Sequence, residues 1–409
     1  MRHIQIGELE DSHPPEALSD AEAAALAKTG LVQVQLAGNG LWRLSPRGLV
    51  GSAEVGDVLL DVRPKDRVGI RQLLFLLGYV RNQGFRPEDV AGVQTTDLWS
   101  ALAESLARQS ERALARGVLH GYVSVDDALR TVRGRIRIAD QISRRPGMLL
   151  PLEVTYDDHT ADIAENRILR AALRRLLGLT HVRGSVRQRL AHLERKLDGV
   201  GDLRAGTALP SWQETRSNTR YVPALRLAEI ILRHSVAETA VGGIRVASFA
   251  VNMATVFEDF VEVALGEAVT RLGMPGGRME RQYKTRLDHP GEGTGQGRIH
   301  MKIDVVYRAS GTPPVVFDAK YKASSAGGNY ANADHYQMLA YCTALGAPRA
   351  WLVYAGAGEH RSRRIVNTGV SVEEYPLDLS QHPDEVLARV SRLAELSVMP
   401  KAVAAGTEG

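Results

Sequence analysis

Residues 315–322, VVFDAKYK, decide the fold of the C-terminal third of this 409-residue chain. The run of β-branched and aromatic residues predicts a strand, and Asp318 and Lys320, two residues apart on it, leave the same face. Asp304, in IHMKIDVVYR (299–308), lies on another predicted strand, joined to the first by a short turn with two prolines. We therefore expect two carboxylates and an ammonium group to meet in a hairpin.

This trio suits a magnesium site. Carboxylate oxygens are the hard ligands that Mg²⁺ prefers, and Mg²⁺ needs few of them because it keeps waters and substrate phosphate oxygens. Lys320 would orient or help deprotonate an attacking water. The acid-x-Lys pattern alone is weak, because 47 acids and eight lysines predict about one such triplet by chance. The other triplet, at residues 194–196, falls in a predicted helix, where residues two apart diverge.

The helix expected around residues 252–272 offers a further acid. At about 100° per residue its apolar side chains form one arc, and Glu258 falls at the edge of that arc, whereas Asp259 and Glu262 fall farther from it. Glu258 is therefore the acid best placed to reach a cleft beside the sheet and to serve as an accessory metal ligand. The alternative is a boundary glutamate paired with an arginine.

A helix after the hairpin carries Asp334, Gln337 and Tyr341 on one stripe, because they are three and four residues apart. An amide beside a phenol next to a metal site could bind a phosphate backbone or position Lys320. The alternative is a tyrosine at the rim of the core with an incidental glutamine.

The chain as a whole predicts an α+β multidomain protein, with four regions that differ in pattern. Residues 1–90 form a β-rich N-terminal domain, which includes a hairpin around Gly38–Gly40 and a closing apolar helix. Residues 91–240 are mainly helical, and the segment 130–145, with six arginines, is predicted to be a strand with a basic outer face. Residues 241–398 form an α/β domain with a mixed sheet, and 399–409 a flexible tail.

Composition excludes several classes of protein. One cysteine, Cys342, rules out a disulfide framework and cysteine-based zinc clusters. The apolar stretches are too short to span a bilayer, so we expect a soluble, cytoplasmic protein without a membrane partner. Of 51 basic residues eight are lysines, which leaves 43 arginines, but the net charge is only +4. Arginine suits phosphate and carboxylate contacts, although an arginine-rich genome would give the same count.

The C-terminal region resembles the PD-(D/E)xK nucleases, and the whole chain is similar to the McrC family, the nuclease subunits of McrBC restriction systems for modified DNA. The segments that carry the resemblance are ID (303–304), DAKYK (318–322), DHYQMLAY (334–341), ADIAENRILRAAL (161–173) and VRGRI (132–136), together with the β-rich N-terminus. Ile303 stands where the nuclease motif has proline, a substitution that this class tolerates. The resemblance implies a restriction-endonuclease-like fold for residues 241–398.

It also implies a function: Mg²⁺-dependent endonucleolytic hydrolysis of double-stranded DNA that contains modified cytosine. Asp304 and Asp318 would be metal ligands, Lys320 the base or electrostatic partner, and Glu258 an accessory catalytic acid and ligand. Gln337 and Tyr341 would support the site or bind the DNA backbone.

The implied partner is an McrB-like AAA+ GTPase hexamer, which binds the GTP, recognises the methylated sites and is stimulated by this chain. No G-x-x-x-x-G-K-[ST] occurs here, and GEGTGQG (291–297) lacks the lysine and precedes a strand, which predicts a hairpin loop. Residues 1–90 are the expected docking module. Two alternatives stay open: a non-catalytic adaptor that activates the GTPase, and a free-standing DNA repair nuclease.

Overall fold

The computed structural model describes residues 1–65, 68–81, 97–182, 184–204, 206–239, 244–273, 276–288, 299–321 and 332–398. Two parts of the sequence interpretation, the GEGTGQG loop and the tail at 399–409, lie outside these ranges. The chain forms two compact units, one made of residues 1–92 and 239–409, the other of residues 93–238. No helix in the described ranges is long and apolar enough to cross a membrane.

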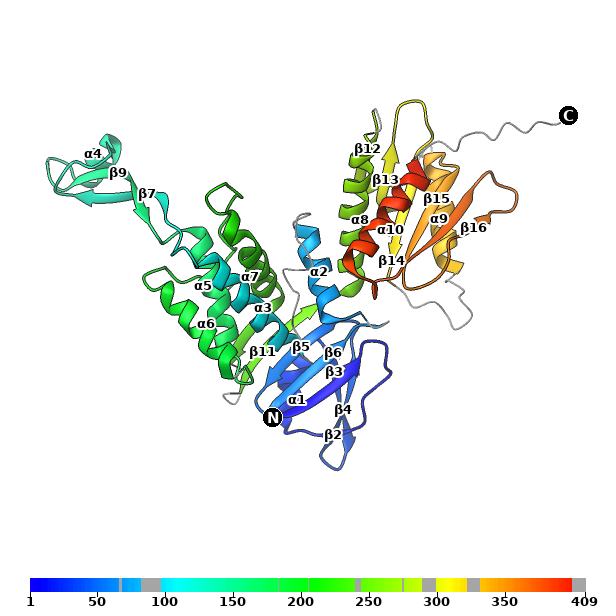
Figure 1. The fold of residues 1–409 in the computed structure, drawn as a ribbon, viewed down its shortest axis with the longest axis horizontal. Coiled ribbons are helices and arrows are strands. Elements are labelled where there is room, and N and C mark those ends of the chain that lie inside the picture. The colour runs from blue at the N-terminus through cyan, green and yellow to red at the C-terminus, as the bar shows by residue number, and fades with distance from the viewer. Residues whose placement is uncertain are drawn as a thin grey trace, which may run out of the picture. The chain divides into compact units, whose positions relative to one another are not determined.

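The N-terminal part of the first unit contains two sheets and the helices α1 and α2 (Figure 1). Its elements are β1 (Arg2–Gly7), β2 (Glu16–Ala17), α1 (Asp20–Lys28), β3 (Val32–Gly38), β4 (Leu41–Pro46), β5 (Val50–Val55), β6 (Val58–Arg63) and α2 (Ile70–Arg81). Ser19 caps α1 and exchanges hydrogen bonds with Glu22, which fixes the start of this helix. The predicted hairpin is β3–β4, and Asn39 and Gly40 adopt positive φ in its turn.

One strand of the N-terminal sheet comes from far along the chain. The sheet runs β1-β6-β5-β11, in which β1 and β6 are parallel and β5 pairs antiparallel with both β6 and β11 (Arg245–Val251). Buried Val246 packs into the same core as Leu60 and Leu26. The segment that follows residue 241 therefore begins inside the N-terminal sheet.

The C-terminal part of the first unit is a mixed sheet with helices, as expected for residues 241–398. After α8 (Met253–Arg271) come β12 (Arg278–Arg286), β13 (His300–Arg308), β14 (Val315–Lys320), α9 (Asn332–Leu345), β15 (Arg349–Ala355), β16 (Arg361–Arg364), β17 (Ser371–Leu377) and α10 (Pro383–Val398). The strand order is β12-β13-β14-β15-β17-β16. The β12–β13–β14 pairings are antiparallel, and β14, β15 and β17 run parallel.

Helices cover this sheet and join it to the N-terminal part. Helix α9 packs on β14, β15 and β17, whereas α8 packs against α10 and α2. Met338 and Cys342 of α9 are buried in the same core as Val316 and Leu352. The rings of Phe75 and Tyr79 on α2 contact Phe260 on α8.

The second unit is a helical bundle that carries a β extension. Its helices are α3 (Leu98–Ala113), α5 (Ala164–Leu177), α6 (Gly184–Lys196), η2 (Thr219–Tyr221) and α7 (Val222–His234), followed by β10 (Ser235–Thr239). The extension contains β7 (Gly121–Leu129), β8 (Arg135–Ile136), α4 (Ile138–Arg144) and β9 (Leu152–Thr160), and within this unit it reaches away from the bundle (Figure 1).

The basic strand predicted at residues 130–145 is wrong for most of its length. Within this segment only β8 is extended, and half of the remaining residues form α4. Gly134 has a φ of 68° and approaches the Thr155 backbone so closely that a Cβ would clash, so the chain turns there. The arginines do not form a free basic face either, because Arg137 and Arg145 pair with buried Glu153 at 3.1 and 2.9 Å.

Candidate active site

Strands β13 and β14 bring Asp304, Asp318 and Lys320 together, as the sequence predicts. Val305 pairs with Phe317 across the two strands, so the two aspartates follow at neighbouring positions. Lys320 Nζ lies 2.5 Å from Asp318 Oδ2, and the Ala319 backbone N–H donates to Asp304 Oδ2 at 3.1 Å. Two carboxylates and an ammonium group therefore share one end of the hairpin.

Asp318 is the most confined of the three, with only 1% of its surface exposed. Burial, and next the negative charge of Asp304, raise its pKa to about 7 against an ordinary value of 3.8, although Lys320 opposes the shift. Near neutral pH this carboxyl group is therefore partly protonated, and further positive charge nearby would favour its ionised form.

Lys320 remains an ammonium group. Burial by itself lowers the pKa of this lysine, but attraction to Asp318, the Asp318 hydrogen bond and the charges of Asp304 and Asp334 outweigh burial and raise the pKa above its ordinary value. Its role at neutral pH is therefore that of a fixed cation and hydrogen-bond donor.

Glu258 of α8 faces the same charges. Asn252 caps this helix with two side-chain hydrogen bonds, and the predicted apolar arc is buried. Burial and then repulsion from Asp304 raise the pKa of Glu258, which Lys320 partly offsets. No arginine pairs with Glu258 in the described part of the chain, so it is not the arginine-paired boundary glutamate that the sequence left open.

Helix α9 contributes Gln337 and Tyr341 through a short chain of hydrogen bonds. The Gln337 amide donates to the Tyr341 hydroxyl at 2.6 Å, and that hydroxyl donates to the Lys302 carbonyl at 2.9 Å. Burial, and next the charge of Asp318, raise the pKa of Tyr341. Tyr341 thus belongs to the core and also ties α9 to β13 next to Asp304.

The donor set fits a small divalent cation. Every candidate ligand is a carboxylate, which suits Mg²⁺. Burial, and next repulsion from Asp304, raise the pKa values of Asp318 and Glu258, and a nearby cation would favour the ionised form of both. No three His, Cys, Asp or Glu side chains of the described ranges are grouped so that they could hold a metal by themselves. Mg²⁺ commonly uses only one or two protein carboxylates, so a site built on Asp304 and Asp318 is compatible with this arrangement. These two residues and Glu258 as metal ligands stay predictions.

Asp334 is a site residue that the sequence did not single out as one. It is 3% exposed, its charge acts on both Asp318 and Lys320, and the Tyr354 hydroxyl donates to it at 3.4 Å. The helical spacing could have pointed to Asp334, because this residue lies on the same stripe of the helix as Gln337 and Tyr341.

Two further groups of contacts could not be read from sequence spacing. Fully buried Glu374 of β17 lies 2.8 Å from His335 Nε2 and also pairs with Arg363, which ties α9 to β17 and β16. Tyr321, directly after Lys320, donates to Glu8 at 2.8 Å and lies under Lys65 Nζ. N-terminal side chains therefore contact the strand end that carries the site.

Comparison with known proteins identifies a protein family and solved structures to which this chain is similar. A family model described as McrBC 5-methylcytosine restriction system component matches residues 44–355. A refined half-complex from a tetradecameric assembly of Thermococcus gammatolerans McrB AAA+ hexamers with bound McrC contains a chain that is 20% identical, with a TM-score of 0.60; the match covers 94% of this chain and 90% of that one. At that identity the likeness shows the fold.

A second solved structure, the cryo-EM structure of the Thermococcus gammatolerans McrBC complex, is 21% identical over 65% of this chain and 88% of the other, with a TM-score of 0.44. No curated protein matches the sequence.

Proposed function

Because the chain belongs to the family of McrBC 5-methylcytosine restriction system components, we propose that it is the McrC-like nuclease subunit of such a system. Its reaction is Mg²⁺-dependent hydrolysis of phosphodiester bonds in double-stranded DNA that contains modified cytosine. The observation that carries the proposal is the convergence of Asp304, Asp318 and Lys320 at one end of β13 and β14.

Each residue has a role that follows from its surroundings. Asp304 and Asp318 would hold Mg²⁺, which, when bound, stabilises the charge that develops on the phosphate and lowers the pKa of a bound water. Lys320 is held by Asp318 and orients the attacking water as a cation; its raised pKa argues against a role as the base. Glu258 is an accessory acid, and Gln337 and Tyr341 keep α9 in place beside β13 or contact the DNA backbone.

The proposed partner is an McrB-like AAA+ GTPase hexamer. A similar solved structure contains McrB hexamers with bound McrC, and the sequence of this chain has no phosphate-binding G-x-x-x-x-G-K-[ST] motif. GTP would therefore be bound by the partner, and this chain would stimulate its hydrolysis.

Two surfaces are candidates for docking the ring. Residues 1–90 are the module that the sequence favours. The β extension of the second unit presents exposed apolar side chains around α4, with Ile138 and Ile142 each 67% and Leu149 87% exposed. Clustered exposed apolar groups mark interaction surfaces, so this extension is the second candidate.

The decisive experiment separates a nuclease from a non-catalytic adaptor. Asp318→Asn and Lys320→Ala should abolish Mg²⁺-dependent cleavage in the presence of the GTPase partner, whereas stimulation of GTP hydrolysis should persist, because these residues serve only the hydrolysis of DNA. The matched control is Lys284→Ala, an exposed lysine on β12, which should cleave normally.

Cleavage by both variants at the wild-type rate would exclude this site. Stimulation of GTP hydrolysis by the wild-type chain without any cleavage of DNA would favour the adaptor. A thermal melt of each variant separates loss of chemistry from loss of folding. Cleavage by the isolated chain, unaffected by the partner and GTP, would instead support a free-standing repair nuclease.

A further inference from the structure

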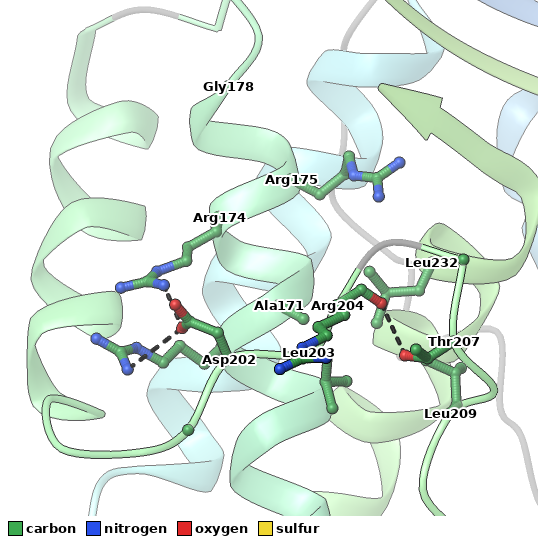
Figure 2. Close-up of a pocket in the computed structure, with 13 residues that line it drawn as sticks. Ala171, Arg174, Arg175, Gly178, Asp202, Leu203, Arg204, Thr207, Leu209 and Leu232 are labelled. Atoms are coloured by element: carbon green, nitrogen blue, oxygen red, sulfur yellow. Dashed lines mark hydrogen bonds and ion pairs between the residues drawn. The ribbon is translucent and has the colours of Figure 1, made fainter. Parts of the chain in front are cut away.

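The second unit contains a cavity that the proposed DNA hydrolysis does not use. Its volume is about 380 Å³, and it lies among the last two turns of α5, the segment that follows α6, and Leu232 of α7 (Figure 2). Four arginines line it: Arg170, Arg174, Arg175 and Arg204. Asp202 is the single acid among the lining residues, so the wall carries a surplus of positive charge.

Two of the four arginines are already neutralised. Arg170 lies 3.0 Å from Glu194 and also donates to the Val200 carbonyl. Arg174 pairs with the same glutamate at 2.8 Å and with Asp202. These guanidinium groups hold α5, α6 and the following segment together, and we assign them a structural role.

The other two have no carboxylate partner within the part of the chain that the structure describes. Arg175 turns the opposite way from Arg174 (Figure 2) and donates to the carbonyl and hydroxyl of Ser235 at 2.9 and 3.4 Å. Burial lowers the pKa of Arg175, as it does for a cation without a counter-charge. Arg204 is exposed. The lining thus includes two guanidinium groups, of Arg175 and Arg204, whose charge no carboxylate of the described residues neutralises.

The remainder of the lining is largely apolar or small. Leu203, Leu209 and Leu232 contribute aliphatic surface, and Gly178, Gly201 and Gly206 leave the backbone uncovered. The volume falls in the range of small-molecule sites. A guanidinium group matches phosphate oxygens in a bidentate fork, while the leucines suit a flat organic group.

We propose that this cavity binds a small organic phosphate of nucleotide size, with its phosphate held by Arg175 and Arg204 and its organic part against the leucines. Such a site would be a ligand-binding function of the second unit, separate from the carboxylates of β13 and β14.

Isothermal titration calorimetry of the full chain tests the proposal, with adenosine 5′-monophosphate, inorganic phosphate and a short duplex of unmodified DNA as probes. The monophosphate should bind more tightly than inorganic phosphate, because the leucines contribute only to the former. Arg175→Gln and Arg204→Gln should each weaken its binding about tenfold or more, since each removes charge-assisted hydrogen bonds. The control is Arg233→Gln, an exposed arginine of α7 outside the lining, which should bind normally.

Ala171→Leu changes no charged residue but fills part of the cavity. It should therefore weaken binding of the monophosphate and leave binding of inorganic phosphate unchanged. This variant and Arg204→Gln carry the test if Arg175→Gln does not fold. Failure of both small phosphates to bind at millimolar concentration, or binding that none of the lining variants changes, would overturn the proposal. Arginine-dependent binding of the duplex without binding of the monophosphate would overturn it as well and make this wall a nucleic-acid surface.

Discussion

At Asp318 the protein keeps a carboxyl group in surroundings that resist its ionisation. Its pKa is raised from 3.8 to about 7, by burial first and then by Asp304. Because the folded state holds this proton more tightly than the unfolded chain does, the contribution of Asp318 to stability falls as pH rises from about 4 to about 7. The group thus lowers the stability of the metal-free protein in the pH range where it could bind a cation.

A first prediction concerns pH. The cleavage rate should rise through about pH 7, because Asp318 must lose its proton to act as a ligand. Raising the Mg²⁺ concentration should move the midpoint to lower pH, since the cation and the proton compete for the same oxygens. The measurement is the initial rate of DNA cleavage against pH at two Mg²⁺ concentrations. If the midpoint of the pH profile does not change with the Mg²⁺ concentration, the titrating group is not a metal ligand.

A second prediction distinguishes two acids of α8. Glu258→Gln should reduce cleavage by roughly one to two orders of magnitude while the protein stays folded, because the substitution removes repulsion from Asp304. Glu262→Gln, one turn further on, should cleave nearly as well as wild type, because Glu262 accepts a hydrogen bond from Gln282. Single-turnover cleavage and thermal melts check both variants; equal losses would remove the special role of Glu258.

The alternation of a strand was enough to predict that Asp304, Asp318 and Lys320 meet, because two-residue periodicity fixes the face of a side chain. Helical periodicity likewise placed Glu258 at the edge of the apolar arc. Contacts between distant segments, such as Tyr321 with Glu8, depend on tertiary packing, and no local pattern encodes them.

At the scale of elements, the mainly helical character predicted for residues 91–240 is confirmed by α3, α5, α6 and α7. The prediction failed at residues 130–145, where alternation of arginines with apolar residues suggested a strand. There Gly134 turns the chain and Glu153 recruits the arginines. The conformation of residues 130–145 thus depends on Glu153 of β9. The pattern of residues 130–145 alone does not show this contact.

A third prediction concerns the pairing of β5 with β11. A Cβ at Gly51 would lie 1.9 Å from the Phe249 carbonyl oxygen, so Gly51→Ala should push these strands apart and lower the free energy of unfolding by about 1–3 kcal/mol. Gly369→Ala is the control, because nothing lies within 4 Å of a Cβ there. Chemical denaturation measures both, and equal stability of the two variants would mean that β11 is not held so closely.

At the scale of the molecule, the pairing of β11 with β5 makes the second unit an insertion between two segments of the first. The sequence suggested consecutive regions and did not predict that β11 belongs to the N-terminal sheet. Composition and periodicity do not reveal which strands pair when about 190 residues separate them. A truncation near residue 95 would also remove the strand that β11 pairs with, so it is a poor test of docking.

A fourth prediction therefore uses surface substitutions to locate docking. We expect Ile142→Glu, in the β extension, to lose association with the GTPase ring and stimulation of GTP hydrolysis, because it places a charge within the exposed apolar surface. Leu36→Glu, at an equally exposed position of β3, should retain both. Size-exclusion chromatography and GTP turnover are the measurements. Loss of association in Leu36→Glu but not in Ile142→Glu would instead place the docking surface in residues 1–90.

The distant origin of β11 also bears on how the chain is made. Strand β5 ends at Val55, and its neighbour β11 ends only at Val251. At about 5–20 residues per second, a ribosome needs roughly 10–40 s to cover that interval. During this time the nascent chain presents β5 as an open strand edge, the kind of edge that pairs with other chains, so chaperones that shield strand edges should have their greatest effect on the yield of this protein while the second unit is still being translated.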